Sequence, residues 1–347
     1  MGSRLLMGLA ATFAFVSVAS SLVWAQAPAD RPSRASEAAR GSAVPRTPWG
    51  DPDLSGVWTT DNMRGVPRER PAEFGTRRYL TDEEYAKRVA QDQKTRATED
   101  NRVGAFRNDV GTRTIRQTSQ VVDPPDGKIP LNDEGKRRAA NRSRGSFGEG
   151  PFNGPGDFTL YDRCITRGAV GSFGPAIYGN GSVIVQSPGM VALSYEMVHD
   201  TRIIPTDGRP HIASTTRQYL GDARGHWEGD TLVVETRNFT DKTAIAGVQH
   251  TEALRLTERF RRVDEATLEY EVTIDDSNVY TRPWTLALTL ASSPGHMFPY
   301  ECHEGNLGLR NILSAERAED RALEEDLKNG IVRKRRPTQN AGEGEQP

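Results

Sequence analysis

Apolar and polar side chains alternate along several segments in the second half of the chain. In residues 267–274, for example, apolar and aromatic residues occupy every second position, and two glutamates lie between them. Successive side chains of a strand point to opposite faces of a sheet, so this pattern predicts a strand with one buried face. Glycine, proline, asparagine and aspartate separate the segments. The predicted strands span residues 183–186, 190–199, 202–204, 215–220, 231–236, 254–260, 267–274 and 284–290. Many short strands with turns between them indicate a mainly β fold, an antiparallel barrel or sandwich.

Helical patterns lie at the two ends of this β region. Thr81 and Glu84 form a capping-box signature, which predicts a helix from there to about Thr98. A weaker helical pattern covers residues 131–142, and a strand at 119–123 ends in a turn at 124–127. A last helix is predicted at 314–328, with a thin apolar stripe formed by Ala315, Ala318, Ala322 and Leu323. We therefore expect a β-rich core with peripheral helices.

The first residues have the composition of a secretory signal. Arg4 precedes an apolar run to Trp24, and residues 25–27 read Ala-Gln-Ala, which predicts a cleavable signal peptide over 1–27. A retained membrane anchor is the alternative, although serines interrupt the run and about 20 apolar residues are needed to span a bilayer. Residues 28–46 are interpreted as a flexible leader, 47–330 as a single β-rich domain with a helical N-terminal third, and 331–347 as a disordered tail. The expected location is periplasmic or secreted.

Charge and cysteine content narrow the classes of partner. The net charge of −2 argues against binding to nucleic acid or to an anionic membrane, and no later segment is apolar enough for stable membrane insertion. A small-molecule ligand or substrate is therefore the expected partner. Cys164 and Cys302 are the two cysteines, and an oxidising compartment favours a disulfide between them. Two free buried thiols are the alternative.

One predicted strand places a carboxylate among apolar side chains. In residues 254–260, Leu254, Leu256, Glu258 and Phe260 share one face, so Glu258 is expected to point inward. Burial raises the pKa of a carboxyl group unless a cation pairs with it, and this can produce a general acid or base. A glutamate that is paired with an arginine, or hydrogen-bonded, and only supports the core is the alternative.

Two further groups are candidates for acid–base chemistry. If the strand 190–199 is regular, His199 ends its apolar face, where Asp200 can orient the imidazole. A structural histidine at a turn is the alternative. The segment 300–304 gathers Tyr300, His303 and Glu304 around Cys302, and a disulfide there would fix the position of His303 and Glu304. We expect Tyr300 to serve as a proton donor.

The remaining candidates concern binding. Arg202 or Arg217 is expected to meet an anionic group of the substrate, and His211 is a further candidate contact. Trp227 and Trp284 either fill the core or form the floor of a cavity. No cofactor is expected, because the phosphate-binding, dinucleotide-binding and serine-hydrolase signatures are absent from the sequence. The alternative is a zinc ion bound by His199, His211 and His303, although the spacing matches no standard metal motif.

Several segments together resemble a large uncharacterised family of bacterial signal-peptide-bearing hypothetical proteins. They are residues 53–58 (DLSGVW), 196–200 (EMVHD), 207–211 (DGRPH), 225–236 (GHWEGDTLVVET) and 301–306 (ECHEGN). The resemblance spans about residues 47–320 and implies no catalytic residue, since that family has no established activity. The G-x-W of Gly56 and Trp58 is also similar to lipocalin-like barrels, in which this tryptophan closes one end. That resemblance implies an apolar cup for a small ligand.

These observations lead to one principal hypothesis about function. The chain is expected to be an exported β-barrel that binds a small, partly apolar organic molecule, with cofactor-independent acid–base catalysis of the lyase, hydratase or hydrolase kind. His199, Glu258 and His303 are expected to line one shared hollow. A non-catalytic periplasmic ligand-binding or carrier protein is the first alternative. A structural module that interacts with the envelope, has no pocket and keeps Glu258 merely ion-paired is the second.

Overall fold

The computed structural model describes residues 44–100, 111–141, 150–293, 295 and 297–335. The chain divides into two units, Met1–Gly41 and Ser42–Pro347, and all of the described residues belong to the second unit. The predicted signal peptide lies outside the described residues, as do most of the predicted leader and residues 336–347 of the predicted tail.

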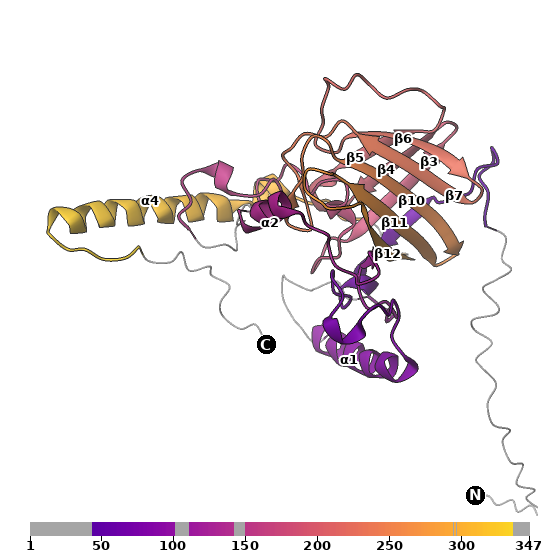
Figure 1. Ribbon diagram of the computed structural model, residues 1–347, viewed down its shortest axis with the longest axis horizontal. Coiled ribbons are helices and arrows are strands. Elements are labelled where there is room, and N and C mark those ends of the chain that lie inside the picture. Colours follow the sequence, from indigo (N-terminus) through magenta and orange to yellow (C-terminus); the bar gives the residue numbers. More distant parts are fainter. Residues whose placement is uncertain (1–43, 101–110, 142–149, 294, 296, 336–347) are drawn as a thin grey trace, which may run out of the picture. The chain divides into compact units, whose positions relative to one another are not determined.

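One large antiparallel sheet forms the body of the described unit (Figure 1). In spatial order its strands are β5 (Thr201–Pro205), β4 (Met190–Tyr195), β3 (Gly181–Ser187), β1 (Gly56–Thr59), β12 (Trp284–Ser292), β11 (Thr267–Asp275), β10 (Arg255–Asp264), β7 (Thr231–Arg237) and β6 (Asp222–Glu228). The short strand β2 (Val121–Asp123) pairs with β12. A separate two-stranded hairpin consists of β8 (Ala244–Ile245) and β9 (Val248–Gln249). The prediction of a mainly β, antiparallel fold is confirmed.

The sheet curls until its two outermost strands, β5 and β6, approach each other. Gly225 of β6 faces this approach: a Cβ atom at that position would lie 3.0 Å from the Cγ2 atoms of Ile204 and Thr206. A residue without a side chain leaves room there for the side chains of β5 and of the residue that follows it. The sheet is thus nearly closed into a barrel, one of the two architectures that the many short strands predicted.

The inner face of the barrel carries the predicted alternating residues. Leu268, Tyr270, Val272 and Ile274 of β11 are fully buried, and the corresponding apolar positions of β10 and β12 are buried beside them. Phe173 enters the same interior from outside the sheet, and its ring centroid lies 4.6 Å from that of Tyr270. Large side chains therefore fill the middle of the barrel, as in other small closed barrels.

Two strand predictions require correction, and two strands of the large sheet were missed. Residues 215–220 form no strand; a single bridge joins Gln218 to Phe239 there. The strand that was expected to reach His199 ends at Tyr195, because the next residue, Glu196, adopts helical backbone angles of φ −62° and ψ −52°. Val198 and His199 then adopt positive φ angles of 68° and 58°. Strands β1 and β6 were not predicted, since glycine and polar residues interrupt their alternation.

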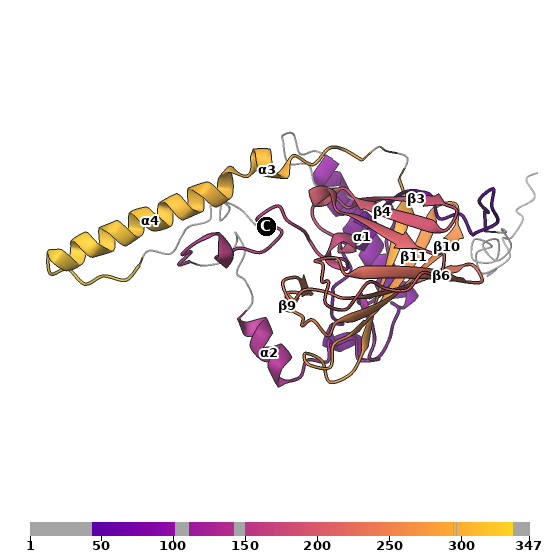
Figure 2. The same ribbon diagram turned by 90° about the horizontal axis from the view of Figure 1, so that it is seen from above.

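The helices lie outside the sheet. The α-helices are α1 (Asp82–Asp100), α2 (Asp133–Ala140), α3 (Cys302–Gly305) and α4 (Leu307–Lys328). Short 3-10 helices lie at η2 (Asp61–Met63), η3 (Ala72–Phe74), η4 (Pro155–Asp157), η5 (Gly171–Phe173) and η6 (Met197–His199). The predicted capping box is present, because Thr81 Oγ1 accepts from Glu84 N and Glu84 Oε2 accepts from Thr81 N. The guanidinium of Arg138 in α2 donates to the carbonyls of Gln249 and His250, which ties this helix to the β8–β9 hairpin (Figure 2).

Helix α4 begins earlier than predicted, because Asn306 caps it by accepting from Leu309 N. Ala315 and Ala318 of the predicted apolar stripe are exposed, so the stripe is not buried along its whole length. The start of the predicted tail, residues 331–335, has no helix or strand, but Arg333 and Arg335 form ion pairs with carboxylates of α4. No helix among the described residues is long and apolar enough to cross a membrane.

The predicted disulfide between Cys164 and Cys302 is present. It joins the start of α3 to a loop that follows η4. Two further contacts support this junction: Asn306 Nδ2 donates to the carbonyl of Asp162, and Arg317 donates to the carbonyl of Phe152. The C-terminal helices are thus attached to the segment 152–164.

Candidate functional site

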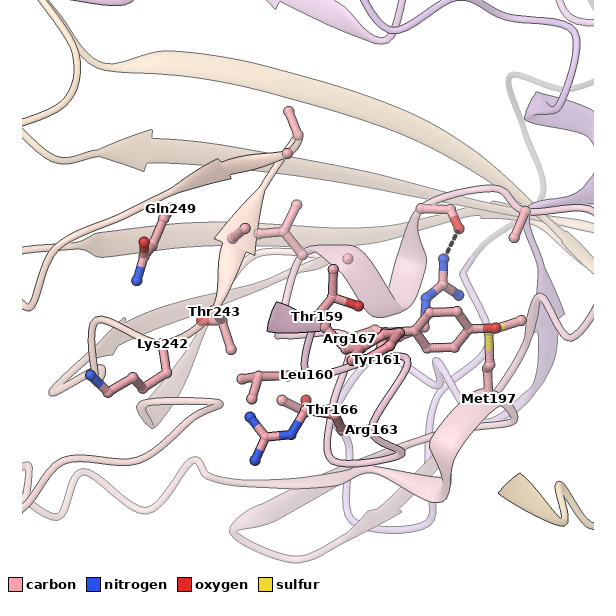
Figure 3. Close-up of a pocket in the computed structure, with 18 of the residues that line it drawn as sticks. Thr159, Leu160, Tyr161, Arg163, Thr166, Arg167, Met197, Lys242, Thr243 and Gln249 are labelled. Carbon is pink, nitrogen blue, oxygen red and sulfur yellow. Dashed lines mark hydrogen bonds between the residues drawn. The ribbon is translucent and has the colours of Figure 1, made fainter. Parts of the chain in front are cut away.

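A cavity of about 770 Å³ lies where three parts of the chain meet the inner face of the barrel (Figure 3). Its walls are the loop segments 156–167 and 170–176 and the β8–β9 hairpin. The apolar part of its lining includes Val170 together with Leu286 and Leu288 of β12. The inward-facing leucines place the cavity at the edge of the barrel core. We call it the arginine cavity, because Arg68, Arg163 and Arg167 all line it.

Positive charge dominates the lining of the arginine cavity. Besides the three arginines, Lys242 lines it, and Lys242 pairs with Asp241 at 3.0 Å. Asp157 is a carboxylate on the lining, and its Oδ2 accepts hydrogen bonds from the backbone N–H groups of Asn153 and Gly154. The lining therefore favours an anionic over a cationic ligand.

Arg167 is held rigidly on the cavity wall. Its Nη2 donates to the carbonyl of Gly174 at 3.2 Å, and its guanidinium lies 5.6 Å from the ring centroid of Tyr161 (Figure 3). Its Nη1 is buried and has no hydrogen-bond partner among the described residues. Burial lowers the pKa of Arg167, and the nearby charge of Arg68 contributes to the same effect.

Arg68 is solvent-accessible, yet the surrounding protein atoms displace much of the bulk water. This desolvation lowers the pKa of its guanidinium. No hydrogen bond or ion pair of its side chain is formed with any part of the chain that the structure describes. The cavity thus brings two guanidinium groups near each other, from positions 68 and 167 of the sequence.

Two phenols meet at the rim of the arginine cavity. The hydroxyls of Tyr161 and Tyr300 lie 3.2 Å apart, and burial raises the pKa of both. Both groups are therefore protonated at neutral pH and able to donate a hydrogen bond. The disulfide explains why the two tyrosines meet. Cys164 lies shortly after Tyr161 in the sequence and Cys302 lies shortly after Tyr300, so the bond between the cysteines brings both tyrosines to one place. The disulfide was expected to position His303 and Glu304; instead, both of these residues are exposed.

His199 and Asp200 lie near this pair but do not act on each other as expected. Nε2 of His199 accepts from the backbone N–H of Tyr300 at 2.5 Å, and the two rings meet edge-on. The carboxylate of Asp200 instead accepts from the hydroxyl of Thr166, a cavity-lining residue. Burial raises the pKa of Asp200. The expectation that Asp200 orients His199 is therefore corrected: its hydrogen-bond partner is Thr166.

Glu258 points inward and is fully buried, as predicted. Both of its oxygens accept from the guanidinium of Arg202, at 2.8 and 2.5 Å, and the hydroxyls of Tyr270 and Thr236 also donate to it. Burial by itself would lower the pKa of Arg202. The attraction of the Glu258 carboxylate is the larger effect, so the pKa of Arg202 is raised well above its usual value. The burial of Tyr195 beside this pair raises its pKa to about 12.

This ion pair changes the interpretation of two predicted site residues. Arg202 is 3% exposed and binds Glu258, so it is not available to a substrate anion. Glu258 is sealed in the core, whereas His199 and His303 are exposed. The expectation that these three residues line one shared hollow is therefore wrong. The hypothesis of a structural module assumed that Glu258 is ion-paired, which it is. The same hypothesis assumed that the protein has no pocket, whereas the arginine cavity is one.

The other predicted binding residues lie elsewhere. Arg217 lines a second cavity of about 570 Å³ and pairs there with Glu252 at 3.0 Å. Nδ1 of His211 lies 2.7 Å from a carboxylate oxygen of Asp222. Trp284 is fully buried in the core, and Trp227 is half-buried; neither tryptophan lines the arginine cavity. Among the described residues no three histidine, cysteine, aspartate or glutamate side chains are placed to hold a metal ion, so the three proposed zinc ligands do not converge.

Sequence reasoning missed the arginines and Tyr161 that line the cavity. A usable signal was present, because Tyr161, Arg163 and Arg167 surround Cys164, one half of the predicted disulfide. Arg68, by contrast, lies in a stretch rich in arginine and glutamate that resembles an ordinary solvated surface. Compared with known proteins, the chain matches no family model and none of the curated proteins.

Proposed function

We propose that the protein binds a small, partly apolar organic molecule in the arginine cavity and does so in the periplasm or after secretion. The observation that carries the proposal is the cavity itself: about 770 Å³, lined by apolar side chains and by about as many polar and charged groups. Binding sites for small molecules commonly have a volume of roughly 300–1,000 Å³ and combine apolar lining with polar groups that orient the ligand. The disulfide supports an extracytoplasmic location, because such bonds persist mainly in oxidising compartments.

A ligand screen with a blocked cavity tests this proposal. Gly156 lines the cavity, and a Cβ atom there would meet nothing within 4 Å, so Gly156→Phe should fill space without disturbing the core. Gly154 has equally open surroundings but does not line the cavity, so Gly154→Phe is the matched control. A metabolite library is screened by thermal shift on all three proteins. A specific ligand should raise the Tm of the wild type and of Gly154→Phe but not that of Gly156→Phe.

Two outcomes would contradict the proposal. A library that contains no stabilising compound would leave the cavity without a ligand. A compound that stabilises Gly156→Phe as strongly as the wild type binds elsewhere on the protein.

Acid–base catalysis on the bound molecule is a second candidate function, favoured by the position of Tyr161. Its protonated phenol lines the cavity and is hydrogen-bonded to Tyr300, so it can donate a proton to a substrate without a cofactor. A reaction of the lyase, hydratase or hydrolase kind needs such a donor.

Tyr161→Phe separates catalysis from binding. If the protein is an enzyme, this variant should lose product formation from the stabilising compound while it keeps the thermal shift. Tyr219→Phe, at an exposed tyrosine outside the cavity, should change neither. A wild-type protein that binds the compound and forms no product on prolonged incubation would identify a binding or carrier protein instead.

A further inference from the structure

The arginine cavity contains two guanidinium groups that no carboxylate of the described residues neutralises, the largely buried one of Arg167 and the solvent-accessible one of Arg68. Neither Arg68 nor Arg167 forms an ion pair within the described part of the chain. Nη1 of Arg167 is buried without any hydrogen-bond partner there, although its Nη2 is bound by Gly174. A buried polar group without a partner is uncommon in native proteins and usually has a specific explanation.

Electrostatics makes this arrangement costly in the unliganded protein. Guanidinium groups stay charged at neutral pH even when their pKa falls, so desolvation here is not relieved by loss of a proton. The two like charges also repel each other, as the effect of Arg68 on the pKa of Arg167 indicates. Another buried arginine has a carboxylate partner: the guanidinium of Arg202 donates hydrogen bonds to both oxygens of Glu258. Arg70, which is also buried, donates instead to the hydroxyl of Thr118 and to the carbonyls of Pro125 and Val121. Nη1 of Arg167 has neither kind of partner among the described residues.

From this contrast we infer that the ligand of the arginine cavity carries an oxyanion, which Arg68 and Arg167 bind together. The inference rests on the proposed function and specifies the class of its ligand. The fork of N–H donors on each guanidinium matches the oxygens of a carboxylate or a phosphate. The rest of the ligand is partly apolar, because Val170, Leu286 and Leu288 are among the apolar side chains that line the same cavity.

Three probes that share one ring distinguish the possible head groups. Benzoate carries a carboxylate, phenyl phosphate carries a phosphate, and benzamide is a neutral analogue of benzoate. Titration calorimetry with the full-length protein should give an affinity about tenfold or more higher for one of the anions than for benzamide, because hydrogen bonds to charged groups are the stronger ones. The anion that binds more tightly identifies the head group as carboxylate or phosphate.

The variants Arg68→Gln and Arg167→Gln should each weaken binding of the preferred anion about tenfold or more and leave benzamide unaffected. Arg209→Gln removes an equal charge from an exposed site that pairs with Asp207, and should change no affinity. Arg68 is solvent-accessible, so its variant remains informative if Arg167→Gln does not fold.

Equal affinity for benzamide and the anions would overturn the inference and leave the proposed function intact. Anion binding that survives both arginine variants would overturn it too, since the anion would then bind elsewhere. If none of the three probes binds at millimolar concentration, the inference also fails, while the library screen still decides whether the cavity binds a small molecule.

Discussion

The ion pair between Arg202 and Glu258 offers the sharpest test of how this barrel is held together. Arg202 lies on β5, near one end of the sheet, and Glu258 lies on β10, so the pair crosses the interior of the barrel. Glu258→Gln removes the negative charge but keeps the shape of the side chain. The amide nitrogen replaces one carboxylate oxygen. It is a hydrogen-bond donor and would face the guanidinium, which is also a donor, in a site with no solvent.

The expected magnitude follows from the burial of the two groups. Arg202 is 3% exposed and Glu258 is not exposed at all, so the variant leaves a charge in the core whose acceptors are the neutral amide oxygen of the glutamine and the hydroxyls of Tyr195 and Thr236. Breaking a buried ion pair by removing one partner costs about 3–5 kcal/mol. A domain is stable by roughly 5–15 kcal/mol, so the loss is a large part of the total.

Equilibrium unfolding in urea, followed by tryptophan fluorescence and circular dichroism, measures this loss. The single variants Arg202→Met and Glu258→Leu and the double variant Arg202→Met/Glu258→Leu, which removes both charges, complete a double-mutant cycle. The double variant is also compared with Glu258→Gln. It should lose less stability than Glu258→Gln, because no uncompensated charge stays in the core. An unchanged m-value would confirm that the variants differ in stability rather than in the mechanism of unfolding.

Two results would refute the reasoning. A loss below about 1 kcal/mol for Glu258→Gln would mean that water or another group neutralises Arg202, contrary to its burial. A double variant whose loss equals the sum of the two single losses would mean that the two charges do not interact.

Two further predictions concern pH and the disulfide. Burial lowers the pKa of His250 below its usual 6.5, so the unfolded chain binds a proton that the folded protein does not, and stability should fall as the pH drops below about 6.5. Urea unfolding at several pH values should show a weaker dependence in His250→Gln; an equal dependence would contradict this. Cys164→Ala/Cys302→Ala opens a link between residues 138 apart, and the chain-entropy model gives a loss of about 5 kcal/mol. Urea unfolding with no measurable loss would contradict that prediction.

The sequence by itself determined the features that depend on near neighbours. The period of two in β10, β11 and β12 predicted which side chains are buried, Glu258 included, because the pleat of a strand fixes the direction of each residue locally. The capping box of Thr81 and Glu84 was predicted for the same reason, since both of its hydrogen bonds span three residues. The cysteine pair followed from the small number of candidates.

Only the tertiary structure decided where charges find their partners. A helical turn that begins at Glu196 ends β4 and removes His199 from the inner face, and alternation cannot predict such a break. Arg202 meets Glu258 across 56 residues, so a side chain expected to bind a ligand became a core partner. Arg68 and Arg167 come together in the cavity across an even longer separation. Closure of a sheet depends on long-range packing, and the position of each buried charge follows from that closure.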